Sequence, residues 1–522
     1  MPRYFNITGP CRPEMHYMLP PADRLINASL DRYIREKLYW VLHAPRQTGK
    51  TTFLMNWMHE INRGGEAFAC YVSVERCQGI ADAETAIPNI ISAVIQWADR
   101  AEIPVPPKNQ DPHSSMLSTL LANWASLCKP KPLIVLFDEV DVLEGATMIS
   151  FLRQLRDGFA GRGTGTFPIS IALVGMRDLR DYLVHSKDGI PVNPGSPFNI
   201  KEDSVTIGNF TRENVTSLIA QHTADTGQVF AEDALARIWH YTSGQPWLVN
   251  ALAKKCVLET APTGKVDTVH AEHVDQAKEL LIKSRATHID SLGQRLREDR
   301  VRRVVQPILI GASDPMMADD DAFLFCQDLG LVTIGEDGSP GIANAIYREV
   351  LARELSFGMQ MAIPPPEFKW KRDDGSLDMD ALMAEFQKFW AWHSDTWEQT
   401  AHYTEAFPHL LLMAFLQRII NGGGRIEREY AAGRGRIDLM IDFGGHRNII
   451  EIKLVHPKRT REATLEMGLD QIARYDEKIN ADTLHLVIFD RRPEARAKPW
   501  EERIAHETRT TPTNKPVTII WC

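Results

Sequence analysis

The stretch 38-LYWVLHAPRQTGKTTFLM-55 decides the fold expected for the first part of the chain. Its apolar beginning, residues 38–42, predicts a buried strand, and apolar residues recur at helical spacing from Phe53 to Ile61. A short polar loop ending in Gly49-Lys50-Thr51 joins the two. A strand, a loop and a helix in this order direct backbone N–H groups and the positive end of the helix dipole at the loop, which therefore suits a phosphate group.

The composition describes an ordinary globular protein. The 522 residues predict two to four domains, and 44% hydrophobic and 24% charged residues are usual for such proteins. A net charge of −9 gives no support for nucleic-acid binding by the whole chain, although it leaves room for a local basic patch. Seven scattered cysteines without a CxxC pair favour a reduced protein over a disulfide framework or a zinc site. Without a leader or a long apolar run, we expect a cytoplasmic protein that does not span a membrane.

Three further motifs follow the phosphate loop. The apolar run 132–137 ends in Asp138-Glu139, as expected where a parallel sheet presents acids at its carboxyl edge. Asp141 follows closely, and either a functional or a structural role is open for it. A second apolar run, 167–174, leads to Gly175-Met-Arg177. Gly244-Gln-Pro246 predicts the start of a helix, with proline in its first turn.

In this order the motifs resemble those of the STAND branch of AAA-like P-loop ATPases, over residues 1–285. The resemblance implies that Lys50 contacts the β- and γ-phosphates of ATP, that Thr51 and Asp138 hold Mg²⁺, and that Glu139 orients the attacking water. Arg177 is expected to sense the γ-phosphate or, alternatively, to form a surface salt bridge. Gly244 and Pro246 would contact the base or only begin a helix, and residues 6–17 form a base pocket or an ordered arm. The expected nucleotide-binding residues are Ala44 (a glycine in the usual motif), Pro45, Arg46, Gln47, Thr48, Gly49, Lys50, Thr51, Thr52, Asp138, Arg177, Gly244 and Pro246.

The middle of the chain predicts a winged helix. Helical patterns between residues 290 and 329 precede two short strands around the glycine turn 335–338. The helix expected at 318–329 carries four aspartates and no lysine or arginine, which is the wrong charge for a helix that contacts DNA phosphates. We therefore expect this segment to pack within the protein. The proline run 364–366 then predicts a linker.

The C-terminal part carries a second group of acids. Helices expected at 379–400 and 405–420 precede an antiparallel hairpin with Asp438 at the start of one strand and Glu451-Ile-Lys453 on the next. Glu451 and Lys453 are two residues apart and so share a face of the strand. Two carboxylates suit Mg²⁺, and a nearby ammonium group can stabilise developing negative charge at a phosphate.

This arrangement resembles the PD-(D/E)XK nucleases over residues 379–495, although Ile437 precedes the aspartate where the motif has proline. The resemblance implies that Asp438, Glu451 and Lys453 are catalytic, that Asp438 and Glu451 bind metal, and that Glu405 and Gln471 assist. A degenerate fold that does not cleave is the alternative. Basic residues surround the site and predict either phosphate docking or a solvated loop. They are Arg434, Arg436, Lys453, His456, Lys458, Arg459 and Arg461.

The sequence thus predicts an α/β protein with five segments: a P-loop ATPase core (1–210), a helical lid (211–285), a winged-helix-like segment (286–362), a linker (363–378) and a nuclease-like domain (379–522). We expect ATP and Mg²⁺ as cofactors, nucleic acid (DNA favoured) as partner, and a homo-oligomer that depends on nucleotide. The expected function is an ATPase that regulates a nuclease, in bacterial defence or as a toxin. The alternatives are a nucleotide-gated scaffold with an inert nuclease fold and, ranked last, a DNA-translocating motor.

Overall fold

The structure is a computed structural model that forms two compact units. Unit 1 comprises Met1–Ala286, Ala318–Thr333 and Ala343–Ile346, and unit 2 comprises Thr287–Met317, Ile334–Ile342 and Tyr347–Cys522. The chain therefore passes between the units several times within the segment expected to be a winged helix. The described residues are 3–26, 28–178, 184–185, 191–192, 200–284, 287–309, 320–335, 338–362, 370–400, 407–420, 424–432, 435–455, 459–490 and 492–522, with side chains omitted at some positions beside the gaps.

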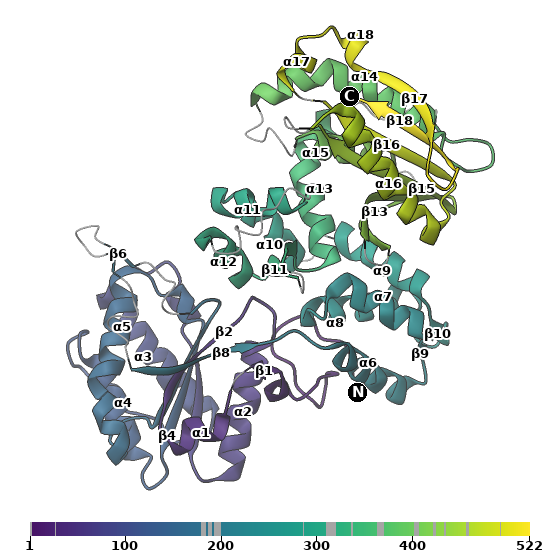
Figure 1. The fold of residues 1–522 in the computed structure, drawn as a ribbon. Coiled ribbons are helices and arrows are strands. Elements are labelled where there is room, and N and C mark those ends of the chain that lie inside the picture. The colour runs from purple at the N-terminus through teal and green to yellow at the C-terminus, as the bar shows by residue number, and fades with distance from the viewer. Residues whose placement is uncertain are drawn as a thin grey trace. The chain divides into compact units, whose positions relative to one another are not determined.

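Unit 1 is built around a six-stranded sheet (Figure 1). Five of its strands are parallel, and β1 is antiparallel to β8 at the edge. Strands β2, β4 and β5 are almost entirely apolar because both faces of the sheet are covered. In spatial order the strands are β1 (Leu25–Ile26), β8 (Lys201–Ile207), β2 (Tyr39–His43), β5 (Ser170–Gly175), β4 (Leu133–Asp138) and β3 (Phe68–Ser73).

Helices cover both faces of this sheet and produce two separate cores. One core joins the sheet to α3 (Ala83–Arg100), α4 (Met116–Leu127) and α5 (Gly145–Gly158). The other joins it to α1 (Leu30–Arg35) and to α2 (Lys50–Gly64), which follows the phosphate loop. Beyond β8 the chain turns helical, as expected for the lid. The lid helices are α6 (Arg212–Thr226), α7 (Glu232–Thr242), α8 (Pro246–Lys255) and α9 (Ala271–Lys283).

The next elements follow the order predicted for the winged-helix-like segment. They are α10 (Thr287–Arg295), α11 (Asp299–Leu309), α12 (Asp321–Asp328), β11 (Val332–Ile334), β12 (Pro340–Ile342) and α13 (Ala345–Ala362). Helix α12 is the acidic helix of the sequence, and it belongs to unit 1. Among the described residues, none of the helices is long and apolar enough to cross a bilayer.

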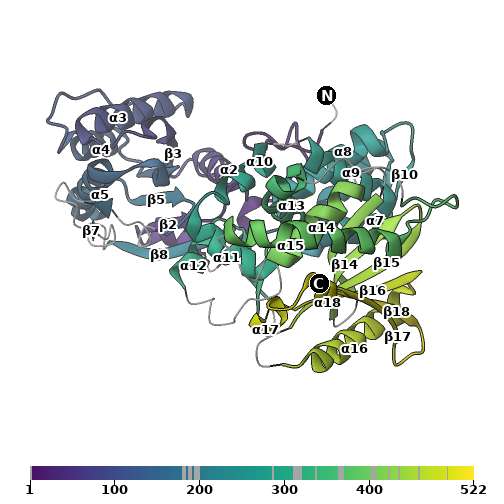
Figure 2. The ribbon, with the colours of Figure 1, turned by 90° about the horizontal axis from the view of Figure 1, so that it is seen from above.

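A second mixed sheet forms the core of unit 2 (Figure 2). Strands β15, β16 and β18 are parallel, and the others are antiparallel to their neighbours. Helices α14 (Met379–Thr400) and α15 (Phe407–Ile420) pack on one face, and α16 (Arg461–Ile479) packs on the other. The strand order is β13 (Gly424–Ala432), β14 (Gly435–Phe443), β15 (His446–Leu454), β16 (Thr483–Phe489), β18 (Pro516–Trp521) and β17 (Ala505–Thr510).

The predicted α/β fold is thus confirmed, with two differences of detail in unit 2. Asp438 lies inside β14, which begins three residues earlier than expected, at Gly435. Strands β17 and β18 complete the sheet beyond the region where the sequence predicted it to end.

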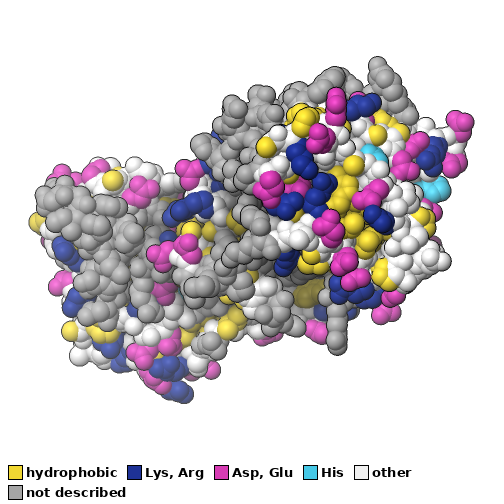
Figure 3. All heavy atoms as spheres, turned by 45° about the horizontal axis from the view of Figure 1, so that its top comes forward, with side chains coloured by type: hydrophobic (Ala, Val, Ile, Leu, Met, Phe, Trp, Pro, Cys, Tyr) yellow, Lys and Arg dark blue, Asp and Glu magenta, His cyan; other side chains and the backbone are white. Residues whose placement is uncertain are grey.

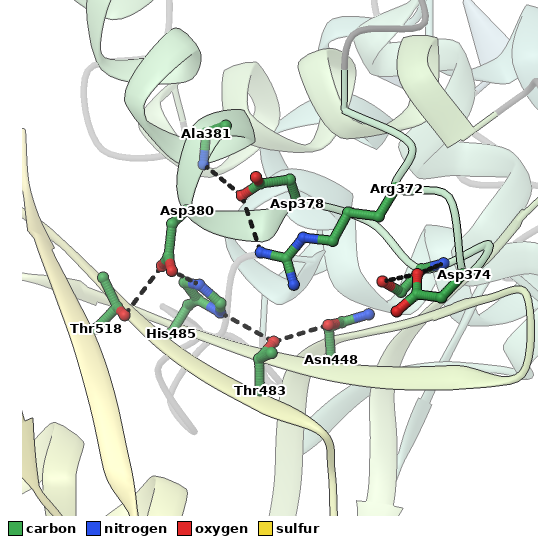
Figure 4. Close-up of polar contacts among 10 residues, drawn as sticks. Arg372, Asp374, Asp378, Asp380, Ala381, Asn448, Thr483, His485 and Thr518 are labelled. Atoms are coloured by element: carbon green, nitrogen blue, oxygen red, sulfur yellow. Dashed lines mark hydrogen bonds and ion pairs between the residues drawn. The ribbon is translucent and has the colours of Figure 1, made fainter.

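A polar network ties the start of α14 to the sheet (Figure 4). His485 of β16 is buried, and its Nε2 lies 3.1 Å from Asp380 Oδ1, to which Thr518 also donates a hydrogen bond of 3.0 Å. On the same sheet face, Thr483 donates to Asn448 Oδ1 over 2.7 Å. The hydrogen bond from His485 is the main cause that lowers the pKa of Asp380 to about 2. Folding therefore favours the ionised carboxylate.

We predict that Asp380→Asn weakens the docking of α14 by about 1 kcal/mol, the order of one partly exposed charged hydrogen bond. Because the pKa of Asp380 is lowered on folding, its contribution is complete above about pH 4 and is lost as the pH falls toward 2. Hydrogen exchange of the α14 amides measures the effect in this unit alone. Glu385→Gln, which breaks only an exposed pair with Lys388, is the matched control. Equal protection of α14 in both variants at pH 7 would contradict the role of Asp380.

Candidate functional site

The phosphate loop of unit 1 connects β2 to α2 and uses backbone conformations that few residues adopt. Gly49, the N-cap residue just before α2, has φ of 97°, and Gln47 has φ of 62°. A Cβ on Gly49 would lie 2.8 Å from a terminal nitrogen of Arg24, so both the conformation and the available space require glycine there. The loop begins at Ala44, which donates its backbone N–H to the carbonyl of Gly175 at the end of β5.

Thr51 and Asp138 meet at the carboxyl edge of the sheet. The Thr51 hydroxyl donates to Asp138 Oδ2 over 2.7 Å, and the hydroxyl of Tyr71 donates to the same oxygen over 3.1 Å. The backbone N–H of Glu139 donates to the other carboxylate oxygen over 3.0 Å. A hydroxyl and a carboxylate oxygen in contact are donors that a hard divalent cation prefers, so this pair fits Mg²⁺.

Lys50 is folded back onto its own loop. Its ammonium donates to the carbonyls of Ala44 at 2.8 Å and Pro45 at 3.0 Å. Burial lowers the pKa of Lys50, while the nearby Asp138 and Asp141 carboxylates oppose that shift. The cation thus satisfies its hydrogen bonds with carbonyls of the loop that the phosphates of a nucleotide would enter.

Glu139 is a strained and electrostatically unfavourable carboxylate. Its backbone lies in the left-handed region with φ of 62°. Burial raises the pKa of Glu139 to about 7, and repulsion from Asp138 and Asp141 adds to the shift. A carboxylate that titrates near neutral pH is suited to accept a proton from water.

Arg177, the predicted γ-phosphate sensor, has an acidic partner. Its Nε donates to Asp328 Oδ2 over 2.9 Å, and its guanidinium carbon lies 5.1 Å from the centre of the Phe325 ring. Both partners belong to unit 1, and Asp328 and Phe325 lie on α12. The salt bridge left open by the sequence is therefore present, and the contact of Arg177 with a nucleotide stays a prediction.

The N-terminal arm contacts the first turn of α2, and Gln245, just before α8, contacts the phosphate loop. The backbone N–H of Cys11 donates to Thr52 Oγ1 over 3.0 Å, and Trp247 of α8 donates to the carbonyl of Ile7 over 2.9 Å. Gln245, between Gly244 and Pro246, donates to the carbonyl of Gln47 over 3.4 Å. The expected base-binding segments thus lie at the loop, and their contact with a base stays a prediction.

Arg24 is a residue of this site that the sequence did not reveal. One terminal nitrogen donates to the carbonyls of Thr48 at 2.8 Å and Gly208 at 2.9 Å, and so joins the phosphate loop to the end of β8. Burial lowers the pKa of Arg24 to about 10. Its partners are backbone carbonyls distant in sequence, which leave no periodic or local signal.

The Glu451 and Lys453 pair of the predicted nuclease site lies on β15 in unit 2. Glu451 is fully buried, and Lys453 Nζ lies 2.6 Å from its Oε1. Glu451 is opposite Leu486, which belongs to the core beneath α16. Gly468 allows α16 to approach closely, because a Cβ there would lie 2.7 Å from Leu486. The acid and the lysine therefore lie on the sheet face that α16 covers.

Of the other predicted nuclease residues, some are described by the structure and some lie outside the described residues. Gln471 lies on α16 and donates to the Tyr475 hydroxyl over 2.7 Å. Asp438 lies on β14 beside Leu439, which is opposite Ile450, so the antiparallel register brings the backbone positions 438 and 451 together. The side chain of Asp438, the whole of Glu405, and Arg434, His456 and Lys458 lie outside the described residues. Among the side chains described, no cluster of three metal-binding residues is found.

Basic and acidic residues lie together around the start of α16 and the end of β16. Arg461 begins α16, with its guanidinium carbon 4.0 Å from the centre of the Trp521 ring and its Nε 3.8 Å from Asp490. Arg492 binds the same carboxylate with two hydrogen bonds of 2.8 Å. On the described part of the face in Figure 3, Lys and Arg side chains are interspersed with Asp and Glu. Any contact with a phosphate backbone would thus be local.

Comparison with known protein families supports the second of the two sequence resemblances. Residues 403–489 match the PD-(D/E)XK nuclease superfamily. This match confirms the resemblance drawn from Asp438, Glu451 and Lys453. None of the curated proteins matches the chain significantly.

Several solved structures are similar to part of the chain, at 15% identity or less and with TM-scores below 0.5. A Walker-type ATPase of Pyrococcus abyssi, PABY2304, is 15% identical with a TM-score of 0.47, and the match covers 66% of this chain and 99% of that one. Cdc6p of Pyrobaculum aerophilum is 14% identical with a TM-score of 0.35, covering 62% and 92%. The ORC2 protein of Aeropyrum pernix is 14% identical with a TM-score of 0.36, covering 63% and 91%.

We predict that Glu139→Gln changes how stability depends on pH. In the wild type the folded-state pKa of about 7 exceeds the ordinary value near 4.3, so the carboxyl contributes stability below pH 4 that is lost as the pH rises to 7. Thermal unfolding of both proteins between pH 5 and pH 8 measures this. The variant should gain on the wild type up to about pH 7 and then keep a constant difference. Parallel curves over the whole range would show that Glu139 does not titrate there.

Proposed function

We propose that this protein is an ATPase that regulates a Mg²⁺-dependent nuclease carried on the same chain. The observation that carries the nuclease part is the buried Glu451, held by Lys453 at 2.6 Å, within the segment that matches the PD-(D/E)XK superfamily. The phosphate loop, with Thr51 and Asp138 in contact at 2.7 Å, supports the ATPase part.

In the ATPase, the chain supplies donors, cations and a base around the phosphates of ATP. Lys50 leaves the carbonyls of Ala44 and Pro45 and pairs with the β- and γ-phosphates. Thr51 and Asp138 hold Mg²⁺, which when bound neutralises phosphate charge. Glu139, whose pKa is near 7, orients water and accepts its proton. Arg177 contacts the γ-phosphate, and Gly244 and Pro246 contact the base.

In the nuclease, Asp438 and Glu451 hold Mg²⁺, which when bound makes a coordinated water more acidic. Lys453 is already placed beside Glu451 and stabilises the negative charge that develops at the scissile phosphate. Gln471 lies on α16, the helix that covers the same sheet face, and helps to position the reacting groups. Glu405 assists as a further acid. Arg461, stacked on Trp521, contributes to docking a phosphate backbone.

We further propose DNA as the substrate, a nucleotide-dependent homo-oligomer as the working form, and a cytoplasmic role in bacterial defence or as a toxin. Support for the regulatory role comes from α12, which belongs to unit 1 although the chain on both sides of it belongs to unit 2. A nucleotide-dependent change at α12 would therefore act on a segment continuous with the nuclease unit.

We predict that Glu451→Gln abolishes Mg²⁺-dependent nicking of plasmid DNA, lowering the rate by about 100-fold or more, because a metal-binding carboxylate is lost. ATP hydrolysis should stay within about twofold of the wild type, since the two sites use different residues. The matched control is Glu466→Gln, an exposed carboxylate on α16. Gel analysis of supercoiled plasmid and phosphate release measure the two activities.

Two outcomes would contradict this proposal. Nicking that survives in Glu451→Gln would remove the nuclease assignment of this site. A wild-type protein that hydrolyses ATP but never cleaves DNA or RNA would favour the nucleotide-gated scaffold with an inert nuclease fold.

A further inference from the structure

Helix α12 contacts the nucleotide site at two points. Asp328, its last residue, accepts the hydrogen bond from Arg177, which follows β5. Two residues later, a Cβ on Gly330 would lie 2.8 Å from Pro45 of the phosphate loop. Gly330 has φ of 74°, so the chain turns sharply against the loop. The end of α12 is thus anchored both to the predicted γ-phosphate sensor and to the loop that binds phosphate.

The charges around this contact set up a competition. Asp138, Glu139 and Asp141 already lie near Lys50, and their mutual repulsion contributes to the raised pKa of Glu139. The Asp328 and Arg177 side chains are 21% and 17% exposed, so their attraction is screened less than that of a surface pair. A γ-phosphate would bring more negative charge to this region. It would attract the Arg177 guanidinium and repel the Asp328 carboxylate.

We propose that Asp328 is a positioning residue for the nucleotide site, which holds Arg177 when no γ-phosphate is present and releases it to ATP. This inference rests on the proposed function, because it requires that the loop binds ATP. The γ-phosphate and Asp328 compete for one guanidinium, so ATP loosens the end of α12 whereas ADP leaves it in place.

The competition predicts a specific pattern of nucleotide affinities. Asp328→Asn removes the competing charge. We expect this variant to bind a non-hydrolysable ATP analogue with Mg²⁺ about 5- to 30-fold more tightly than the wild type, which lies within the range usual for coupled sites. Its affinity for ADP should stay within about twofold. In the Arg177→Met background, Asp328→Asn should tighten the analogue much less, because only the direct repulsion between Asp328 and the γ-phosphate is then removed, and it should leave the affinity for ADP unchanged. Asp321→Asn removes an exposed charge from the same helix and should change neither affinity.

A second measurement uses the wild-type protein and does not depend on a folded variant. Hydrogen exchange of the α12 amides should accelerate with the ATP analogue and remain slow with ADP, because only the γ-phosphate displaces Asp328. Isothermal titration calorimetry gives the affinities, and mass spectrometry gives the exchange.

The results separate this inference from the proposed function. A wild-type protein that binds no nucleotide would overturn both. If the wild type binds ATP, either of two results would overturn the role of Asp328 alone. In the first, Asp328→Asn binds the analogue no more tightly than the wild type does. In the second, it binds ADP more tightly by the same factor as the analogue. Equal exchange of α12 with ADP and with the analogue would do the same.

Discussion

An excess of negative charge marks the proposed nucleotide site. Asp138 ends β4, and the partly buried Glu139 and Asp141 follow it, at the edge of the sheet where the phosphate loop also begins. Lys50 is the cation beside them, and its ammonium is satisfied by loop carbonyls. Burial with neighbouring acids raises the pKa of Glu139 to about 7. Such a site favours cations, as the proposed binding of Mg²⁺ together with ATP requires.

The same principle explains the placement of the two arginines of unit 1. Arg24 lies behind the loop and binds carbonyls of Thr48 and Gly208, so its charge stabilises the loop without entering the site. Arg177 lies at the end of β5 and is neutralised by Asp328 of α12. In unit 2 the buried Glu451 is balanced by Lys453 in a similar way. Arg24, Arg177 and Glu451 are thus each paired with an opposite charge or bound to backbone carbonyls.

The sequence revealed the parts of these sites that local patterns specify. Strands β2 and β4 are short apolar runs, and their carboxyl ends carry Gly49-Lys50-Thr51 and Asp138-Glu139, so the fold and the nearness of these residues could be predicted. The spacing of Glu451 and Lys453 placed both on one strand face for the same reason. The contacts of Arg24 with Gly208 and of Arg177 with Asp328 join residues far apart in the chain and follow no period. Strand β17, with the polar sequence Ala505–Thr510, was missed because an exposed edge strand lacks apolar alternation.

Control of the nuclease by the ATPase is tested most directly by the rate of plasmid nicking by the whole chain at fixed Mg²⁺, with and without ATP, compared with the same rates for Lys50→Ala. We expect ATP to change the wild-type rate by about fivefold or more, as a coupling of about 1 kcal/mol between the sites requires. The variant, which lacks the ammonium group proposed to bind phosphate, should not respond to ATP. Equal nicking by the wild type with and without ATP would contradict the claim that the ATPase governs the nuclease.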